Sequence, residues 1–274
     1  MDMLNGKTVL VTGSSDGIGR QTALELAQRG ARIFVHARGE ARGQAALDAL
    51  RDELPNGAFD LVIGDLASLE QVRGLAASVA SRTDRLDVLI NNAGVKPTTR
   101  QVSADGYELT FAVNHLAHFL LTDLLLPLIQ KAEGGRILTV SSVSHYRGTI
   151  AFDDPQLTHG WDSYKAYAQS KLANVLFAYD LAHRLADTDI TSNTLHPGVV
   201  STKLLVEGFG SQGGDSLADG AATSVFLAAS PDVAAVSGRY FQYKQVTESA
   251  PISHDRAWQE RLWTMSAALT GVKG

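Results

Sequence analysis

Short apolar runs alternate regularly with amphipathic stretches along this chain, and this alternation restricts its fold more than any other feature. The apolar runs, each typical of a buried strand, cover residues 7–11, 32–37, 59–63, 86–90, 136–140 and 190–195. The stretches with helical periodicity lie between them, at residues 18–28, 41–54, 68–81, 107–130 and 163–185. Strands that alternate with helices require a parallel sheet covered by helices on both faces. We therefore predict an α/β fold with a doubly wound parallel sheet of about seven strands.

No linker, repeat or low-complexity segment interrupts this pattern, so we expect residues 1–274 to form one domain that ends in a helix over 252–270. The formal net charge of −5 offers no basic surface for nucleic acid. The chain has no cysteine, and its histidines do not follow the spacing of a metal site. The N-terminus lacks the pattern of a signal peptide, and the apolar stretch Leu116–Ile129 is too short and too polar to span a bilayer. We therefore expect a cytoplasmic protein without a membrane anchor.

A glycine-rich loop, residues 12–19, connects the first predicted strand to the first predicted helix. Its glycines allow the backbone to turn tightly and to approach a pyrophosphate, which would lie at the positive end of the helix dipole. The alternative is a glycine-rich turn without a ligand, but the strand–loop–helix context favours a Rossmann-type dinucleotide site. The cofactor-binding residues expected in the loop are Gly13, Ser15, Asp16, Gly17, Ile18 and Gly19.

The end of the second predicted strand bears on the choice between NAD(H) and NADP(H). NAD-binding folds place a carboxylate there, on the ribose 2′-hydroxyl. In this chain the position is Ala37, and Arg38 follows it. A guanidinium suits a 2′-phosphate, and the missing carboxylate removes a repulsion that would exclude one. We therefore predict NADP(H) in preference to NAD(H). The alternative is a solvated surface arginine, and Asp16 opposes the prediction because some NADP binders carry a basic residue there.

Small and polar residues follow the other predicted strands, at the carboxyl edge where open parallel sheets bind their ligands. An aspartate after the third strand can accept a hydrogen bond from an adenine amino group. Small residues after the fourth strand permit the backbone to approach a ribose closely. These residues are Asp65 and Leu66, then Asn92, Ala93 and Gly94, then Ser141 and Ser142, and finally Pro197, Gly198, Val200 and Thr202. Asp65 alone would more often be a helix cap and Asn92 a turn residue, but their gathering at one edge favours a ligand site.

Tyr167 and Lys171 lie four residues apart in a predicted helix, so both side chains fall on one face, one turn apart. A cation beside a phenol stabilises phenolate and lowers a pKa that is normally about 10, which suits general acid–base catalysis. The spacing alone is common in helices and gains its meaning from the loop and the strand ends. The rival phenols Tyr164 and Tyr146 have no lysine four residues later, and we expect them in a pocket wall or at the surface.

Taken in order, these motifs resemble the short-chain dehydrogenase/reductase family over nearly the whole chain. The matching segments are TGSSDGIG at 12–19, Asp65, NNAG at 91–94, Asn114, Ser142, the Tyr167/Lys171 pair and HPG at 196–198. Residues 114–122, 167–177 and 196–198 are most similar to the retinol-dehydrogenase-like branch, which includes soluble members. Residues 145–162 look like an insertion relative to the smallest family members.

The resemblance implies four catalytic residues. Tyr167 would be the general acid in carbonyl reduction and the base in alcohol oxidation. Lys171 would lower the pKa of Tyr167 and hold the nicotinamide ribose. Ser142 would hydrogen-bond the substrate oxygen. Asn114 would disturb its helix and support a water that relays protons to Lys171.

The resemblance also implies contacts around the nicotinamide and between subunits. Thr202 would contact the nicotinamide amide, in a pocket shaped by Pro197 and Gly198. The two long helices predicted at 107–130 and 163–185 would pack against a second subunit, in a homodimer or homotetramer.

We therefore expect an NADP(H)-dependent oxidoreductase that transfers a hydride between nicotinamide and a small hydrophobic carbonyl or secondary alcohol. Residues 203–218 mix glycines with apolar side chains, which predicts either a substrate lid or a disordered loop. One alternative function is a non-catalytic NADP-sensing protein, although such proteins tend to lose the tyrosine or the lysine. Another is an epimerase or dehydratase, whose longer chains use a differently spaced glycine loop.

Overall fold

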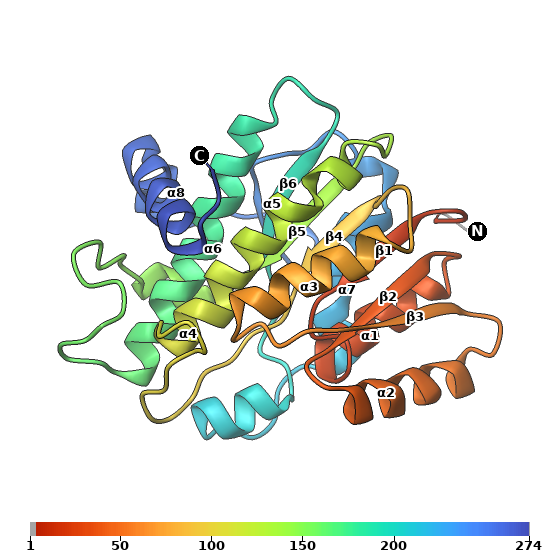
Figure 1. The fold of residues 1–274 in the computed structure, drawn as a ribbon, viewed down its shortest axis with the longest axis horizontal. Coiled ribbons are helices and arrows are strands. Elements are labelled where there is room, and N and C mark those ends of the chain that lie inside the picture. Colours follow the sequence, from red (N-terminus) through yellow and green to blue (C-terminus); the bar gives the residue numbers. More distant parts are fainter. Residues whose placement is uncertain (1–3, 274) are drawn as a thin grey trace.

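A computed structural model describes residues 4–273, which form an α/β structure around one central sheet (Figure 1). Within these residues the sheet has eight strands in the order β3-β2-β1-β4-β5-β6-β7-β8. Neighbouring strands from β3 to β7 are parallel, and only β8 runs antiparallel to its neighbour. The predicted α/β fold with a doubly wound, largely parallel sheet is confirmed, and the last two strands lie beyond the runs recognised in the sequence.

The elements closely follow the predicted alternation. The strands are β1 (Thr8–Val11), β2 (Arg32–Ala37), β3 (Ala58–Ile63), β4 (Val88–Asn91), β5 (Arg136–Val140), β6 (Thr191–His196), β7 (Tyr240–Gln242) and β8 (Gln245–Val246). The α-helices are α1 (Gly17–Ala27), α2 (Glu40–Glu53), α3 (Leu69–Ala80), α4 (Leu109–Phe111), α5 (Ala117–Ile129), α6 (Ser163–Arg184), α7 (Leu217–Ala229) and α8 (Arg256–Thr270). Shorter helical segments are η1 (Ala112–Leu116), η2 (Val143–Arg147), η3 (Leu204–Gly208), η4 (Pro231–Val233) and η5 (Pro251–His254).

The two faces of the sheet carry separate hydrophobic cores. Along β1, Val9 and Val11 belong to the core that includes α1 and α7, whereas Leu10 belongs to the core that includes α3, α5 and α6. Side chains of a strand alternate between its two faces, so a continuous apolar run can fill both cores. Figure 1 shows α3 and α5 in front of the strands and α7 behind them.

The long helix predicted over residues 107–130 is divided by a π-helical segment. The order is α4, then η1, then α5, and Asn114 lies in the middle of η1. A π turn accommodates an extra residue and is frequent at functional sites. The predicted disturbance of this helix around Asn114 is therefore present.

The same stretch, Leu109–Ile129, has 21 residues and is long and apolar enough to cross a membrane by length and composition. The expectation considered only Leu116–Ile129, and the helix is longer because it begins at Leu109. However, 78% of its apolar window is buried inside the protein, as in a core helix of a folded domain.

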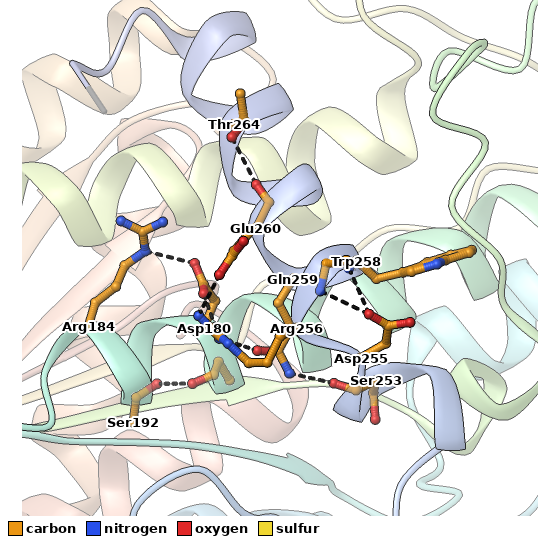
Figure 2. A network of polar contacts seen from close by, with 12 residues as sticks. Asp180, Arg184, Ser192, Ser253, Asp255, Arg256, Trp258, Gln259, Glu260 and Thr264 are labelled. Carbon is orange, nitrogen blue, oxygen red and sulfur yellow. Dashed lines mark hydrogen bonds and ion pairs between the residues drawn. The ribbon is translucent and has the colours of Figure 1, made fainter.

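Helix α8 covers the outer side of α6, as Figure 2 shows. It begins at Arg256, four residues after the predicted start, because Asp255 caps it and the turn η5 precedes it. The buried Asp180 of α6 accepts hydrogen bonds from Arg184 at 2.7 Å and from Arg256 of α8 at 2.8 Å (Figure 2). Every residue of α6 from Ala166 to Leu181 is buried within the single chain.

This packing bears on the expected homodimer or homotetramer. The prediction placed a second subunit against the two long helices, but the chain's own C-terminal helix contacts both of them. Trp263 of α8 packs on Phe119 of α5 and Phe177 of α6, with ring centroids 4.8 and 6.0 Å apart. The oligomeric state stays a prediction.

Candidate active site

The predicted pair Tyr167 and Lys171 lies on the first half of α6, where both side chains are buried. Helix α6 begins at Ser163 because the Asp162 carboxylate accepts hydrogen bonds from two backbone N–H groups of the first turn. The Lys171 Nζ lies 5.5 Å from the centroid of the Tyr167 ring and donates to the Val140 carbonyl at 3.0 Å. The helix thus brings the pair together as the spacing predicts.

Burial controls the pKa values of this pair. It raises the pKa of Tyr167 to about 12, although the Ser142 hydroxyl opposes the rise, and it lowers the pKa of Lys171 to about 8. Desolvation dominates the pKa of Tyr167, and the predicted lowering of this pKa by Lys171 stays a prediction. At neutral pH the phenol keeps its proton and the ammonium keeps its charge.

Ser142 follows β5 and caps the turn η2, where its hydroxyl accepts from the Ser144 N–H at 3.2 Å. His145 fixes this turn from behind: its Nε2 accepts from the Ala250 N–H at 3.1 Å, so Nδ1 carries the proton and donates to the Ser142 carbonyl at 2.6 Å. Burial lowers the pKa of His145, which keeps the ring neutral. His145 was not singled out from sequence, because nothing local to it predicts the contact with residue 250.

Asn114 faces the same place as Lys171. Its side chain exchanges hydrogen bonds with the backbone of Val95 at 2.8 and 3.0 Å and donates to Ser170 Oγ at 2.9 Å. A β carbon on Gly94 would lie 3.5 Å from both Asn114 Oδ1 and Lys171 Nζ. The structure therefore gathers Asn114 and Lys171 beside Gly94, with Tyr167 and Ser142 completing the group.

His118 links this group to the first strand, and sequence reasoning did not single it out. Its Nδ1 lies 3.1 Å from the Asn114 carbonyl, and its Nε2 lies 2.9 Å from Thr12 Oγ1. Thr12 Oγ1 also accepts from the backbone N–H groups of Asn92 and Ala93. Burial lowers the pKa of His118 to about 3, so the imidazole is neutral and works as a hydrogen-bonding bridge. The four-residue spacing from Asn114 was the available signal.

The glycine loop packs against the turn after β4. Gly13 and Gly17 have φ of +67° and +56°, which residues with side chains rarely adopt. A β carbon on Gly19 would lie 2.4 Å from the Gly13 carbonyl oxygen and 2.5 Å from Asn92 Nδ2, and one on Gly13 would lie 3.0 Å from the Ala93 side chain. Only glycine fits these positions, and the loop offers bare backbone at the start of α1. These residues fit a dinucleotide pyrophosphate.

Asp16 has a different environment from the one expected for an isolated acid in this loop. Its carboxylate caps α1 and accepts hydrogen bonds from Lys203 at 2.7 Å and Arg42 at 2.8 Å. Lys203 first, and then the cap and Arg42, hold its pKa below the usual value. Two basic residues distant in sequence thus balance the charge, and no local pattern predicts either contact. The loop residues Ser15 and Ile18 are half-buried, and Ile18 lies against α7.

The residues predicted to bind the adenosine end of the cofactor differ in how accessible they are to a ligand. Arg38 is exposed at the end of β2, where a 2′-phosphate contact requires it. The Asp65 carboxylate accepts from the Ala67 N–H at 2.9 Å, so it also serves the turn before α3. Leu66 is buried in the core on the α3 side, which leaves only its backbone for a ligand.

His36 joins this end of the site to the glycine loop, and it too was missed. Its Nδ1 accepts from the Gly13 N–H at 2.8 Å, so Nε2 is the protonated nitrogen and donates to the Gly64 carbonyl at 2.8 Å. Burial lowers the pKa of His36, which preserves this neutral form.

The segment after β6 closes the other side of the site. Gly198 has φ of +96°, and Val200 is buried after it. A β carbon on Gly17 would lie 3.7 Å from Thr202 Cγ2, so Thr202 borders the glycine loop, and its contact with the nicotinamide amide stays a prediction. Residues 203–218, here called the flap, follow, and the Phe209 ring lies 5.3 Å from the Tyr167 ring. Pro197 is half-buried at the start of this segment.

A cavity of about 680 Å³ lies elsewhere in the structure, between the end of α6 and the start of β6. None of the predicted catalytic residues lines it, because it opens at the amino ends of the strands. Its polar lining includes Tyr179, His183, Asp189, Arg239 and His254.

Comparison with known proteins agrees with this geometry. A family model described as short chain dehydrogenase matches residues 7–210. The chain therefore belongs to the short-chain dehydrogenase family, and it is an oxidoreductase acting on CH–OH donors with a nicotinamide cofactor. It is 41% identical to retinol dehydrogenase 14 of Mus musculus over 292 residues, which cover 98% of this chain and 87% of the relative. It is also 41% identical to retinol dehydrogenase 13 of Homo sapiens over 283 residues, with 98% and 86% covered. These similarities place it in the retinol-dehydrogenase-like branch.

Solved structures show the same fold. An uncharacterised protein from Mycobacterium paratuberculosis has a TM-score of 0.82 and 30% identity, covering 98% of this chain and 94% of that one. A short chain dehydrogenase from Escherichia coli CFT073 complexed with NADPH has a TM-score of 0.74 and 27% identity, covering 89% and 99%.

Proposed function

We propose that the protein uses NADP(H) to interconvert a hydrophobic carbonyl compound and its secondary alcohol, with Tyr167 as the general acid and base. One observation carries this proposal: the buried pair Tyr167 and Lys171 lies with Ser142 and Asn114 at the sheet edge that also holds the glycine loop. A structural role alone does not explain a buried lysine, because an unpaired ammonium is costly to bury.

Each of these residues has a chemical task in carbonyl reduction. A bound nicotinamide cofactor supplies the hydride. Tyr167 keeps its proton at neutral pH and donates it to the carbonyl oxygen as negative charge develops there. The Ser142 hydroxyl orients that oxygen toward the phenol. Lys171, whose pKa is lowered to about 8, can return a proton to the phenol and hold the ribose.

The preference for NADP(H) rests on charge at the end of β2. Arg38 is exposed there, and Arg42 lies one turn into the following helix. The acid that opposed this preference, Asp16, is balanced by Lys203 and Arg42. The related Escherichia coli structure contains NADPH, which supports a phosphorylated dinucleotide in this fold.

The hydrophobic substrate is supported by apolar side chains around the flap. Val206 and Phe209 within it are partly exposed, as are Val199 before it and Leu217 at its end. Exposed apolar side chains gathered at a catalytic edge are typical of a site for an apolar ligand. The retinol dehydrogenases among the relatives act, by their names, on an apolar alcohol.

Replacement of one phenol tests the proposal. Tyr167→Phe should abolish turnover of a panel of aldehydes and ketones, followed by NADPH absorbance, and should leave NADPH binding nearly intact. Tyr164→Phe, one turn earlier on the same helix, should retain turnover and serves as the matched control. Unchanged turnover in Tyr167→Phe would refute the assignment. NADPH binding without turnover of any substrate by the unsubstituted protein would favour the NADP-sensing alternative.

A further inference from the structure

Lys96 connects three segments that build the active site. It follows the turn after β4, two residues beyond Gly94. Its ammonium donates to Ser163 Oγ at 3.0 Å, at the first residue of α6, and to the carbonyl oxygen of Gly208 in the flap. Ser163 in turn donates to the Pro97 carbonyl at 2.6 Å, which fixes the lysine's own loop to α6. One side chain therefore joins the turn after β4, helix α6 and the flap.

The same ammonium holds an aromatic ring above the catalytic phenol. Lys96 Nζ lies 4.5 Å from the centroid of the Phe209 ring. The Phe209 ring meets the Tyr167 ring at 5.3 Å and 87°, edge to face. A β carbon on Gly208 would lie 3.1 Å from the Lys96 carbonyl oxygen, so a residue with a side chain would crowd this contact. Phe209 is therefore placed against Tyr167 by contacts that Lys96 provides.

Beyond Phe209, the flap rejoins the body of the protein at Asp215. The Asp215 N–H donates to the Val199 carbonyl at 2.7 Å, and the Ser201 N–H donates to the Asp215 carbonyl at 3.2 Å. Between Asp215 and Phe209 lie Gly210, Gly213 and Gly214, all with positive φ, which give the segment freedom to bend.

The ion pair between Lys203 and Asp16 is too exposed to hold the flap strongly. The two side chains are 69% and 46% exposed, and such pairs contribute little in water. Lys96 is half-buried, and cation–π contacts and charged hydrogen bonds strengthen when water is excluded.

We propose that Lys96 is a positioning residue that latches the flap over Tyr167, and that Phe209, held by this latch, is the apolar wall that selects hydrophobic substrates. The second half rests on the proposed function, because it places the substrate between Phe209 and Tyr167. The first half concerns the flap alone and can be measured without turnover.

Hydrogen exchange tests the latch. Lys96→Met removes the charge and keeps the length of the side chain, so amide exchange in residues 204–211 should become about fivefold faster or more, as expected when a cation–π contact and a charged hydrogen bond are lost. Lys165→Met, at an exposed position in the first turn of α6, is the matched control and should leave this exchange unchanged. Equal exchange in the flap of both variants would overturn the latch.

Kinetics with two methyl ketones test the wall. The ratio compared is kcat/KM for octan-2-one divided by kcat/KM for acetone. Phe209→Ala should lower this ratio by roughly tenfold, because the variant lacks the ring that covers the longer alkyl chain. Lys96→Met should change the ratio in the same direction through KM, with the dissociation constant of NADPH unchanged. An equal loss for both ketones would overturn this role. Tyr167→Phe separates the two proposals, because it should lose turnover and keep the flap exchange of the unsubstituted protein.

Discussion

Asp180→Asn is the substitution that most directly tests how the C-terminal helix is held. The Asp180 side chain is 1% exposed and binds both Arg184 and Arg256 (Figure 2). Breaking a fully buried ion pair costs about 3–5 kcal/mol. The two arginines are 41% and 43% exposed, so solvent screens part of the attraction, and the asparagine keeps one oxygen as an acceptor. We therefore expect a loss of about 2 kcal/mol in the free energy of unfolding.

Thermal unfolding measures this loss. For a protein of this size the melting temperature should fall by roughly 4–8 °C. Asp153→Asn is the matched control, because Asp153 also pairs with an arginine of α8, Arg261, but its side chain is fully exposed. That variant should melt like the unsubstituted protein. If Asp180→Asn melts at the temperature of the control, the buried pair does not anchor α8 and the reasoning fails.

Two further predictions concern the reaction. Arg38→Ala should weaken the binding of NADPH by about ten- to hundredfold, which corresponds to the loss of a charged hydrogen bond, and should hardly affect the binding of NADH. Equal losses of affinity for both cofactors in fluorescence titrations would argue against a 2′-phosphate contact. Carbonyl reduction needs both the Tyr167 proton and the Lys171 charge, so its kcat should fall as the pH rises through about 8, where Lys171 loses its proton. Alcohol oxidation needs the phenolate and should rise over the same interval, and a reduction rate that increases between about pH 7 and 9 would contradict these roles.

Much of the sheet was predictable from sequence because strands buried on both faces are continuous apolar runs. The six predicted runs correspond to β1–β6, each within a residue or two at its ends. β7 and β8 were missed because they have three and two residues, too few for a periodicity. Helix α7 was missed too, since its alanines and small residues, such as Ala221 and Ala222, lack a clear apolar stripe.

The candidate site divides in a similar way. The site residues that belong to a local motif were predicted from sequence, because a loop, a strand end and a helical turn each involve neighbouring residues. Residues that act through partners far along the chain were not: Lys96 meets the flap over a hundred residues away, and His145 meets Ala250. Neither has a spacing that predicts its partner, since both contacts are created by the order of strands in the sheet.

The pKa of Tyr167 likewise depends on more than the local spacing. Helical spacing correctly placed a cation one turn from the phenol, but a pKa is set by the balance between that charge and desolvation. Burial raises the pKa of Tyr167 and lowers that of Lys171. The protonated phenol is the form that carbonyl reduction needs, and the phenolate is the form that alcohol oxidation needs. The packing of the fold therefore sets the protonation state of both side chains, which the spacing of two residues could not reveal.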